Sequence, residues 1–114
     1  MNPQANLPIN LEHLHQLSDG DTDFELELLQ VFVEDTQSHL DAARSAIATD
    51  DYKTLEREVH QIKGASGNVG AQSMQVLALA LEQQAQKQEL INPTEIVSQL
   101  EQQLSQVKAF MAKY

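Results

Sequence analysis

The sequence has no cysteine, and glycine and proline are scarce, with 4 and 3 copies in 114 residues. Without cysteine the chain cannot form a disulfide framework, a zinc–thiolate site or a cysteine nucleophile. No stretch approaches the roughly 20 apolar residues that a membrane-spanning helix needs. Residues 1–10 also lack the basic and apolar regions of a signal peptide. These absences favour a cytoplasmic protein, since a chain without disulfides suits a reducing compartment.

Basic residues are also few, because 7 Lys and Arg stand against 17 Asp and Glu, which gives a net charge of −10. A surface of this charge repels nucleic-acid phosphates and anionic lipids, so we expect neither nucleic acid nor a membrane as a partner. The length suits a single domain over residues 1–114, with residues 1–8 as a loose lead-in. The polar outer faces of the expected helices favour a monomer.

The dominant pattern is helical, because apolar residues recur at spacings of three and four along most of the chain. The expected helices cover residues 11–17, 22–48, 52–68 and 72–87, and a last helix begins at Pro93. Gly70 suits the left-handed end of a helix, and Asn10 and Asn92 are expected to cap the helices that follow them. Short connections favour an all-α fold, an antiparallel four-helix bundle with a short additional N-terminal helix.

The long helix over residues 22–48 is expected to bury one stripe of side chains. The members of that stripe are Phe24, Leu28, Val31, Phe32, Leu40, Ala43 and Ile47. His39 falls within the stripe and is expected to be a hydrogen-bonded or boundary residue rather than a ligand. His13 and His15 point to different sides of a helix, so they do not easily share a metal ion. We expect no metal site, because no paired helices carry Glu-x-x-His.

The third expected helix places one histidine outside the core. Its core face consists of Tyr52, Leu55, Val59, Ile62, Ser66 and Val69. His60 lies about 130° from the centre of that face on a helical wheel, so it is expected to face solvent. Gly64 and Gly67 share its stripe, although a glycine inside a helix costs roughly 1 kcal/mol relative to alanine. The two glycines therefore leave an open shelf beside the imidazole, and Lys63 can bring a positive charge to it.

This combination of residues suits phosphoryl transfer. Attack on phosphorus needs a neutral ring nitrogen, access and compensation of the phosphoryl charge, and imidazole has an ordinary pKa of about 6.5. The stripe around His60 offers all three. Taken singly, His60 and Lys63 would be ordinary surface residues and the glycines would serve close packing; only their combination favours a function. The chain offers no nucleotide-binding loop and no second acid–base pair, so we expect a carrier and not an autonomous kinase.

Residues 60–71, HQIKGASGNVGA, resemble the signature of histidine-phosphotransfer (HPt) domains. That signature reads histidine, any residue, leucine or isoleucine, lysine, glycine and two small residues, and it ends in aliphatic-glycine-alanine. The resemblance extends over most of the chain. Residues 9–36 resemble the opening of the family, and Leu81-Glu82 resembles a pair often seen in its fourth helix.

The resemblance implies that His60 is phosphorylated through its outer ring nitrogen, that Lys63 supports the phosphoryl charge and that Gly64 keeps the site open. It implies as partners the receiver domains of a hybrid histidine kinase and of a response regulator. The aspartate and magnesium ion of the receiver perform the chemistry, so no cofactor is expected on this chain. The family docks partners around the histidine and on the short N-terminal helix. The corresponding candidates here are Arg57, Gln61, Gly67 and Leu14.

Two alternatives remain beside the carrier. A non-catalytic module that binds receivers and sequesters them would share the same fold and surface, and only phosphoryl exchange separates the two. An unrelated structural bundle would use its amphipathic faces for oligomerisation, and replacement of His60 by glutamine would then have no functional effect.

Overall fold

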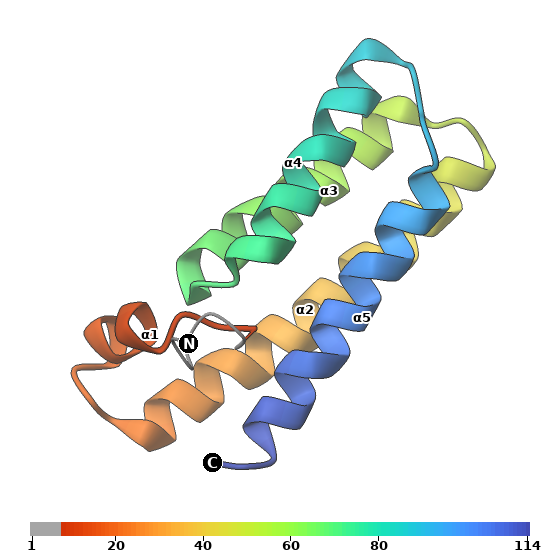
Figure 1. Cartoon of the computed structure of the whole chain (residues 1–114). Coiled ribbons are helices and arrows are strands. Elements are labelled where there is room, and N and C mark those ends of the chain that lie inside the picture. The colour runs from red at the N-terminus through yellow and green to blue at the C-terminus, as the bar shows by residue number, and fades with distance from the viewer. Residues whose placement is uncertain (1–7) are drawn as a thin grey trace, which may run out of the picture.

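The computed structural model describes residues 8–114, so the expected lead-in over residues 1–8 lies outside the described residues except for Pro8. The helices are α1 (Leu11–Ser18), α2 (Thr22–Ala48), α3 (Tyr52–Val69), α4 (Gln72–Lys87) and α5 (Pro93–Met111). Figure 1 shows α2 to α5 as an antiparallel bundle with α1 across one end, near the turn between α3 and α4. The all-α fold with a short additional helix is thus confirmed, and the expected helix limits agree to within one residue.

The order of packing places α3 between α2 and α4, and α5 between α4 and α2. Each helix of the bundle therefore has two neighbours, and α3 lies diagonally opposite α5. No helix within residues 8–114 combines the length and the apolar character that would let it cross a membrane.

The ends of the helices follow from local hydrogen bonds. The carboxylate of Asp51 accepts a hydrogen bond from the amide of Thr54 at 3.1 Å, which caps the start of α3. Gly70 ends the same helix in the left-handed conformation, with φ of 80°, as expected. Asn92 precedes Pro93 as expected, but its own φ is 51° and its side chain makes no capping hydrogen bond. The predicted start of α5 and the place of Asn92 as its N-cap residue are thus confirmed, although the side chain of Asn92 supplies no capping hydrogen bond.

The expected buried stripe of α2 is wrong in its first half. Phe24 is 42% exposed and Val31 is 65% exposed. The buried residues of α2 are Glu25, Leu29, Phe32, Val33, Thr36, Leu40, Ala43 and Ala46. The true stripe contains two polar residues, a glutamate and a threonine, where a core pattern calls for apolar ones. Over the first turns of α2 the predicted stripe therefore lies one residue before the buried one, at Phe24 and Leu28 in place of Glu25 and Leu29.

The short helix α1 also differs from expectation in one residue. Leu14 is fully buried in the core together with Ile9, whereas Leu17 is 49% exposed. Leu14 is therefore not available to a partner in this structure, and its assignment as a docking residue is corrected. Its burial follows from the position of α1, which lies over the end of the bundle and packs this side chain into the core.

Candidate functional site

His60 lies in the middle of α3 and faces solvent, with 59% of its side chain exposed. The residues of the opposite side of α3 are buried as expected, namely Leu55, Val59, Ile62, Ser66 and Val69, and Tyr52 is half-buried. The exposure of His60 thus follows from the helical repeat, because the core residues fix how α3 is rotated.

A buried glutamate on α4 orients the imidazole of His60. The Nδ1 atom of His60 lies 2.6 Å from Oε2 of Glu82, and Nζ of Lys63 donates a hydrogen bond of 2.7 Å to Oε1 of the same carboxylate. Glu82 itself is almost wholly buried between α3 and α4. One carboxylate therefore binds both His60 and Lys63 of α3 from the neighbouring helix.

Glu82 is ionised near neutral pH. Burial raises the pKa of a carboxyl group, but the hydrogen bonds and positive charge that Lys63 and His60 supply outweigh burial and lower the pKa of Glu82. An ionised carboxylate only accepts hydrogen bonds, so Nδ1 of His60 carries the hydrogen. In the neutral ring the lone pair then lies on Nε2, the nitrogen that is not bound to Glu82.

The two glycines of α3 differ in their surroundings. A Cβ atom added to Gly64 would meet no other atom within 4 Å, so nothing inside the protein requires glycine there. A Cβ atom added to Gly67 would lie 2.8 Å from Nε2 of Gln75, whose flexible side chain covers this part of α3. Close packing therefore explains Gly67 in part, whereas Gly64 leaves open space one turn beyond His60, as the sequence predicts.

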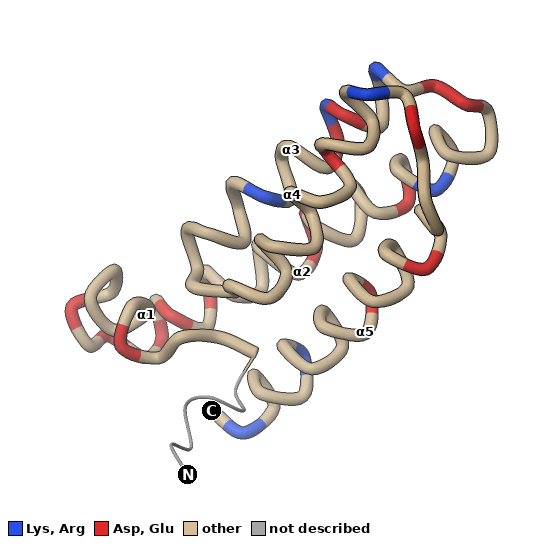
Figure 2. The backbone as a smooth tube through the Cα atoms, turned by 45° about the horizontal axis from the view of Figure 1, so that its top comes forward, with Lys and Arg blue, Asp and Glu red and all other residues tan. Residues whose placement is uncertain are grey.

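Positive charge is concentrated on the helix that carries His60. Lys53, Arg57 and Lys63 of α3 account for three of the 7 basic residues in a chain of net charge −10. Figure 2 shows how sparse Lys and Arg are along the backbone compared with Asp and Glu. A shallow pocket of about 390 Å³ opens beside the imidazole, lined by Lys53, Glu56, Arg57, His60 and Glu82. Lys53 and Arg57 at this pocket therefore offer positive charge to an approaching anion, beside the carboxylates of Glu56 and Glu82.

Three apolar residues outside the core of α2, the exposed Phe24 and Val31 and the half-buried Leu28, lie on the side of that helix that faces α3. Leu28 and His39 are close to three helical turns apart, so they lie on one side of α2. His39 contacts α3 there, because its Nδ1 lies 2.5 Å from Oε2 of Glu58. Because α2 and α3 are antiparallel, Phe24, Leu28 and Val31 lie toward the C-terminal end of α3, whereas the exposed Arg57 and Gln61 lie closer to the level of His39.

The remaining histidines have structural partners. His39 is hydrogen-bonded as expected, and Nε2 of His13 lies 3.0 Å from the carbonyl oxygen of Asn68. Within residues 8–114 no three His, Asp or Glu side chains gather closely enough to hold a metal ion.

Glu82 is the residue of the site to which sequence reasoning assigned no role. The sequence offered a signal, because Glu82 lies four residues after Ala78 and three before Ala85, and both are buried. A glutamate at a core position of one helix, facing a histidine and a lysine of the next, is a candidate for an orienting carboxylate. The phase of α4 could not be settled from its sequence, because apolar and glutamine residues occur on several of its sides.

Comparison with known proteins bears on this geometry. A family model described as the Hpt domain matches residues 27–110, which include His60, Lys63 and Glu82. The chain is 34% identical over 68 residues, 57% of its length, to histidine-containing phosphotransfer protein 2 of Arabidopsis thaliana. It is 22% identical over 112 residues, 98% of its length, to the phosphorelay intermediate protein rdeA of Dictyostelium discoideum. Each match covers 44% of the relative, so the chain spans less than half the length of these proteins.

Solved structures share the fold over nearly the whole chain. Histidine-containing phosphotransfer protein B (HptB) from Pseudomonas aeruginosa PAO1 superposes with a TM-score of 0.85 at 25% identity, over 99% of this chain and 95% of that one. The HPT domain of a sensor hybrid histidine kinase from Shewanella gives a TM-score of 0.76 at 19% identity, over 94% and 96% of the two chains. At that lower identity the likeness concerns the fold alone.

Proposed function

This chain belongs to the Hpt domain family, and we propose that it acts as a phosphorelay carrier of a two-component signalling system. In this proposal His60 accepts a phosphoryl group from the aspartate of one receiver domain and passes it to another receiver. The observation that carries the proposal is the shared carboxylate, because Glu82 presents His60 with Nε2 free and keeps Lys63 beside it. His15 also binds a buried glutamate, but within residues 8–114 His60 alone shares its carboxylate with a lysine and lies one helical turn from the open space at Gly64.

The proposed transfer begins at Nε2 of His60. Its lone pair attacks the phosphorus atom of the receiver's aspartyl phosphate, and a nitrogen–phosphorus bond forms while the bond from phosphorus to the aspartate oxygen breaks. The aspartate leaves as a carboxylate. The imidazole ring gains positive charge, which Glu82 offsets while the hydrogen on Nδ1 remains in the hydrogen bond. The reverse steps, onto the aspartate of a second receiver, restore the neutral ring.

Lys63 has a separate part in this proposal. Before transfer its ammonium group is bound to Glu82 and is mostly shielded from solvent. A phosphoryl group on His60 brings close to two negative charges one helical turn away. The long side chain of Lys63 can turn its ammonium group toward those oxygens and leave Glu82 to the charged ring. The same lysine thus balances the carboxylate before transfer and the phosphoryl group after it.

The partner is proposed to dock on a surface that we name the docking face, formed by Arg57, Gln61 and Gly64 of α3 and by Phe24, Leu28 and Val31 of α2. It combines exposed apolar side chains with a basic site, which suits the acidic, magnesium-binding active site proposed for the receiver. We propose that the receiver supplies the magnesium ion and the catalysis, so that this chain is a phosphocarrier without kinase activity of its own.

The test is a phosphotransfer assay with phosphorylated receiver domains and three forms of the protein. Wild type and the control His39→Gln, which changes a histidine of α2 in the same way, are expected to become labelled. The variant His60→Gln is expected to remain unlabelled. The label should be labile to acid and stable to base, as a phosphoramidate is. Equal labelling of wild type and His60→Gln would show that another residue accepts the group. Binding of receivers without labelling would favour the sequestering module.

A further inference from the structure

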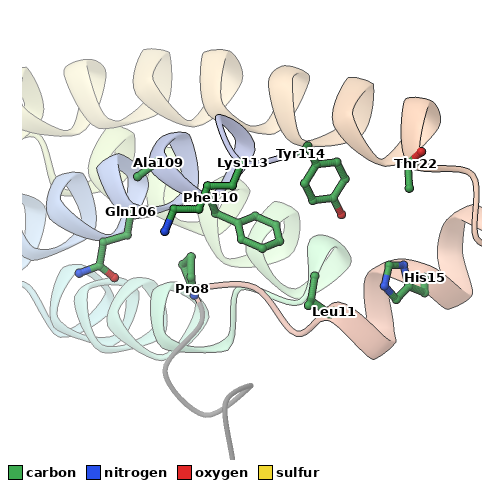
Figure 3. Close-up of a pocket in the computed structure, with 9 residues that line it drawn as sticks. All are labelled: Pro8, Leu11, His15, Thr22, Gln106, Ala109, Phe110, Lys113 and Tyr114. Atoms are coloured by element: carbon green, nitrogen blue, oxygen red, sulfur yellow. The ribbon is translucent and has the colours of Figure 1, made fainter.

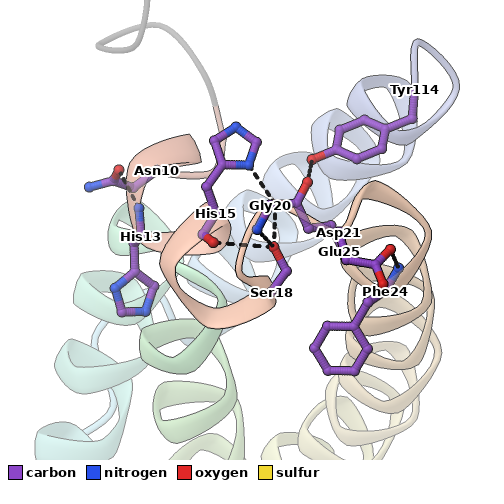
Figure 4. Close-up of polar contacts among 9 residues, drawn as sticks. All are labelled: Asn10, His13, His15, Ser18, Gly20, Asp21, Phe24, Glu25 and Tyr114. Carbon is purple, nitrogen blue, oxygen red and sulfur yellow. Dashed lines mark hydrogen bonds and ion pairs between the residues drawn. The ribbon is translucent and has the colours of Figure 1, made fainter.

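A second buried carboxylate lies far from His60. Glu25, in the first turns of α2, is fully buried. Three side chains donate hydrogen bonds to it, namely His15 through Nδ1 at 2.5 Å, Ser18 through its hydroxyl at 2.5 Å and Tyr114 through its hydroxyl at 2.9 Å. Figure 4 shows these donors arranged around the glutamate. Burial opposes ionisation, but the three donors outweigh it and lower the pKa of Glu25.

The Glu25 cluster, which we define as His15, Ser18, Glu25 and Tyr114, joins three parts of the chain. His15 and Ser18 belong to α1, Glu25 to α2, and Tyr114 follows α5. A buried cluster around an ionised carboxylate need not stabilise the fold, because removal of the carboxylate from water costs free energy. Such clusters are better explained by the geometry that they specify, since every donor has one defined place.

Apart from the bonds of Glu25, few contacts join α1 to the end of α5. A pocket of about 730 Å³ separates them, lined by Pro8, Leu11, His15, Thr22, Gln106, Ala109, Phe110, Lys113 and Tyr114. Figure 3 shows the side chains of α1 and of α5 on opposite walls of this pocket. Apolar packing therefore does not fix the distance across it, and the polar bonds of Glu25 do.

The other attachments of α1 lead to the helix that carries His60. The amide of Asn10 donates a 2.9 Å hydrogen bond to the carbonyl of Gly70, and His13 contacts the carbonyl of Asn68. These carbonyls lie at the end of α3. The Glu25 cluster thus completes a chain of contacts that places α1 and the start of α2 relative to α3.

Two exposed apolar residues are direct neighbours of cluster members. Leu17 precedes Ser18 and is 49% exposed, and Phe24 precedes Glu25 and is 42% exposed. Ser18 bonds directly to Glu25, so this bond fixes how the two backbone segments that carry Leu17 and Phe24 lie relative to one another. In Figure 4 the ring of Phe24 points away from the carboxylate to which the donors converge.

We propose that Glu25 is a positioning residue for partner binding, which holds Leu17 of α1 in a fixed arrangement relative to Phe24 of the docking face. The partner is the phosphorylated receiver domain, so the inference rests on the proposed function. Glu25 acts through these two residues and touches neither the phosphoryl group nor His60. Loss of its bonds lets α1 move relative to α2 and changes how Leu17 and Phe24 are presented together to the receiver, while the chemistry at His60 is unchanged.

The experiment compares Glu25→Gln with Glu34→Gln, which removes the same charge from an exposed position of the same helix. Transfer from a phosphorylated receiver is measured at varied receiver concentration. Glu25→Gln is expected to raise KM about tenfold at an unchanged kcat, and Glu34→Gln is expected to leave both constants unchanged. Amide hydrogen exchange should quicken in α1 and stay constant in α3. If Glu25→Gln fails to fold, Tyr114→Phe removes one donor and should produce a smaller change in the same direction.

A double-mutant cycle separates positioning from a general loss of stability. In a chain that already carries Leu17→Ala and Phe24→Ala, Glu25→Gln is expected to raise KM little further, because the residues that it positions are gone. Additive effects on KM would overturn the inference, as would equal KM values for wild type and Glu25→Gln. If wild type itself neither binds receivers nor accepts phosphoryl groups, the proposed function fails and this inference fails with it. Wild-type transfer with no effect of Glu25→Gln overturns the inference alone.

Discussion

The imidazole of His60 on α3 is bound through Nδ1 to the buried carboxylate of Glu82 on α4, at 2.6 Å. This bond selects the tautomer and the direction of the ring at a residue that is otherwise exposed. It also means that the proposed nucleophile is defined by two helices, since the packing of α3 against α4 sets the distance between them. The predictions below follow from this pair and from its surroundings.

Replacement of Glu82 by glutamine should slow transfer to His60 by about a hundredfold, the range in which correctly placed proton and charge groups contribute. The amide removes the negative charge that offsets the charged ring. It can also turn its NH₂ group toward Nδ1, which would place the ring hydrogen on Nε2 and block attack. Transfer rates measure the loss, and nitrogen NMR of the imidazole reports the tautomer. Glu56→Gln is the matched control, because it removes the same charge from the wall of the same pocket. A normal rate with Glu82→Gln would contradict the orienting role.

Replacement of Gly64 by alanine should stabilise the fold and impair transfer. The added Cβ meets no atom within 4 Å, so the usual gain of about 1 kcal/mol for alanine over glycine inside a helix should appear in the free energy of unfolding. The same methyl group intrudes on the shelf where a receiver approaches, and we expect transfer to slow by roughly tenfold. Thermal or denaturant unfolding and the transfer assay measure the two effects.

Gly67→Ala provides the comparison for Gly64. Its Cβ would approach Nε2 of Gln75 to 2.8 Å, so the side chain of Gln75 must move and the gain in stability should be smaller. An unchanged transfer rate in Gly64→Ala would show that the shelf does not serve access.

Removal of the charge of Lys63 should change the titration of Glu82. Burial alone raises the pKa of this carboxyl group, and the hydrogen bond from Lys63 is the largest influence that lowers it. In Lys63→Met the pKa of Glu82 should therefore rise, and NMR titration of the side-chain carboxyl carbon measures it. Phosphorylated His60 should also lose its phosphoryl group faster, because no cation faces it. Lys53→Met is the control. It removes a positive charge from another residue that lines the same pocket, and it should leave the pKa of Glu82 nearly unchanged.

The lowered pKa of Glu82 also makes the stability of the fold depend on pH. A carboxyl group whose pKa is lower in the folded state than in the unfolded chain stabilises the fold above its unfolded pKa of about 4.3. That stabilisation is lost as the pH falls through the folded pKa. Because Lys63→Met raises the folded pKa of Glu82, the free energy of unfolding should fall less on acidification in this variant than in wild type.

The sequence was sufficient for the helices and for the exposed face of α3, because both depend on local periodicity and on clear end signals such as Gly70. It was insufficient where a polar residue occupies the core. Glu25 and Thr36 concealed the buried side of α2, and Phe24 and Val31 were placed inside as a result. Glu82 escaped assignment for the same reason, because its burial depends on partners that only the packing of α3 against α4 supplies. Leu14 was placed on the surface since the sequence does not say which side of a short helix rests on the bundle.

The tyrosine that closes the Glu25 cluster offers a prediction that needs no partner protein. Burial and the hydrogen bond to Glu25 raise the pKa of Tyr114 to about 12. Because the unfolded value is about 10, this bond stabilises the fold fully below pH 10 or so and is lost as the pH rises through the folded value. In a Tyr52→Phe background Tyr114 is the one remaining tyrosine, so the ultraviolet absorbance of its phenolate follows it alone. Glu25→Gln should lower this pKa, because the negative charge that disfavours the phenolate is gone while the burial remains. An identical titration in both chains would mean that the hydroxyl of Tyr114 does not bind Glu25 in solution, and the cluster would then join only α1 and α2.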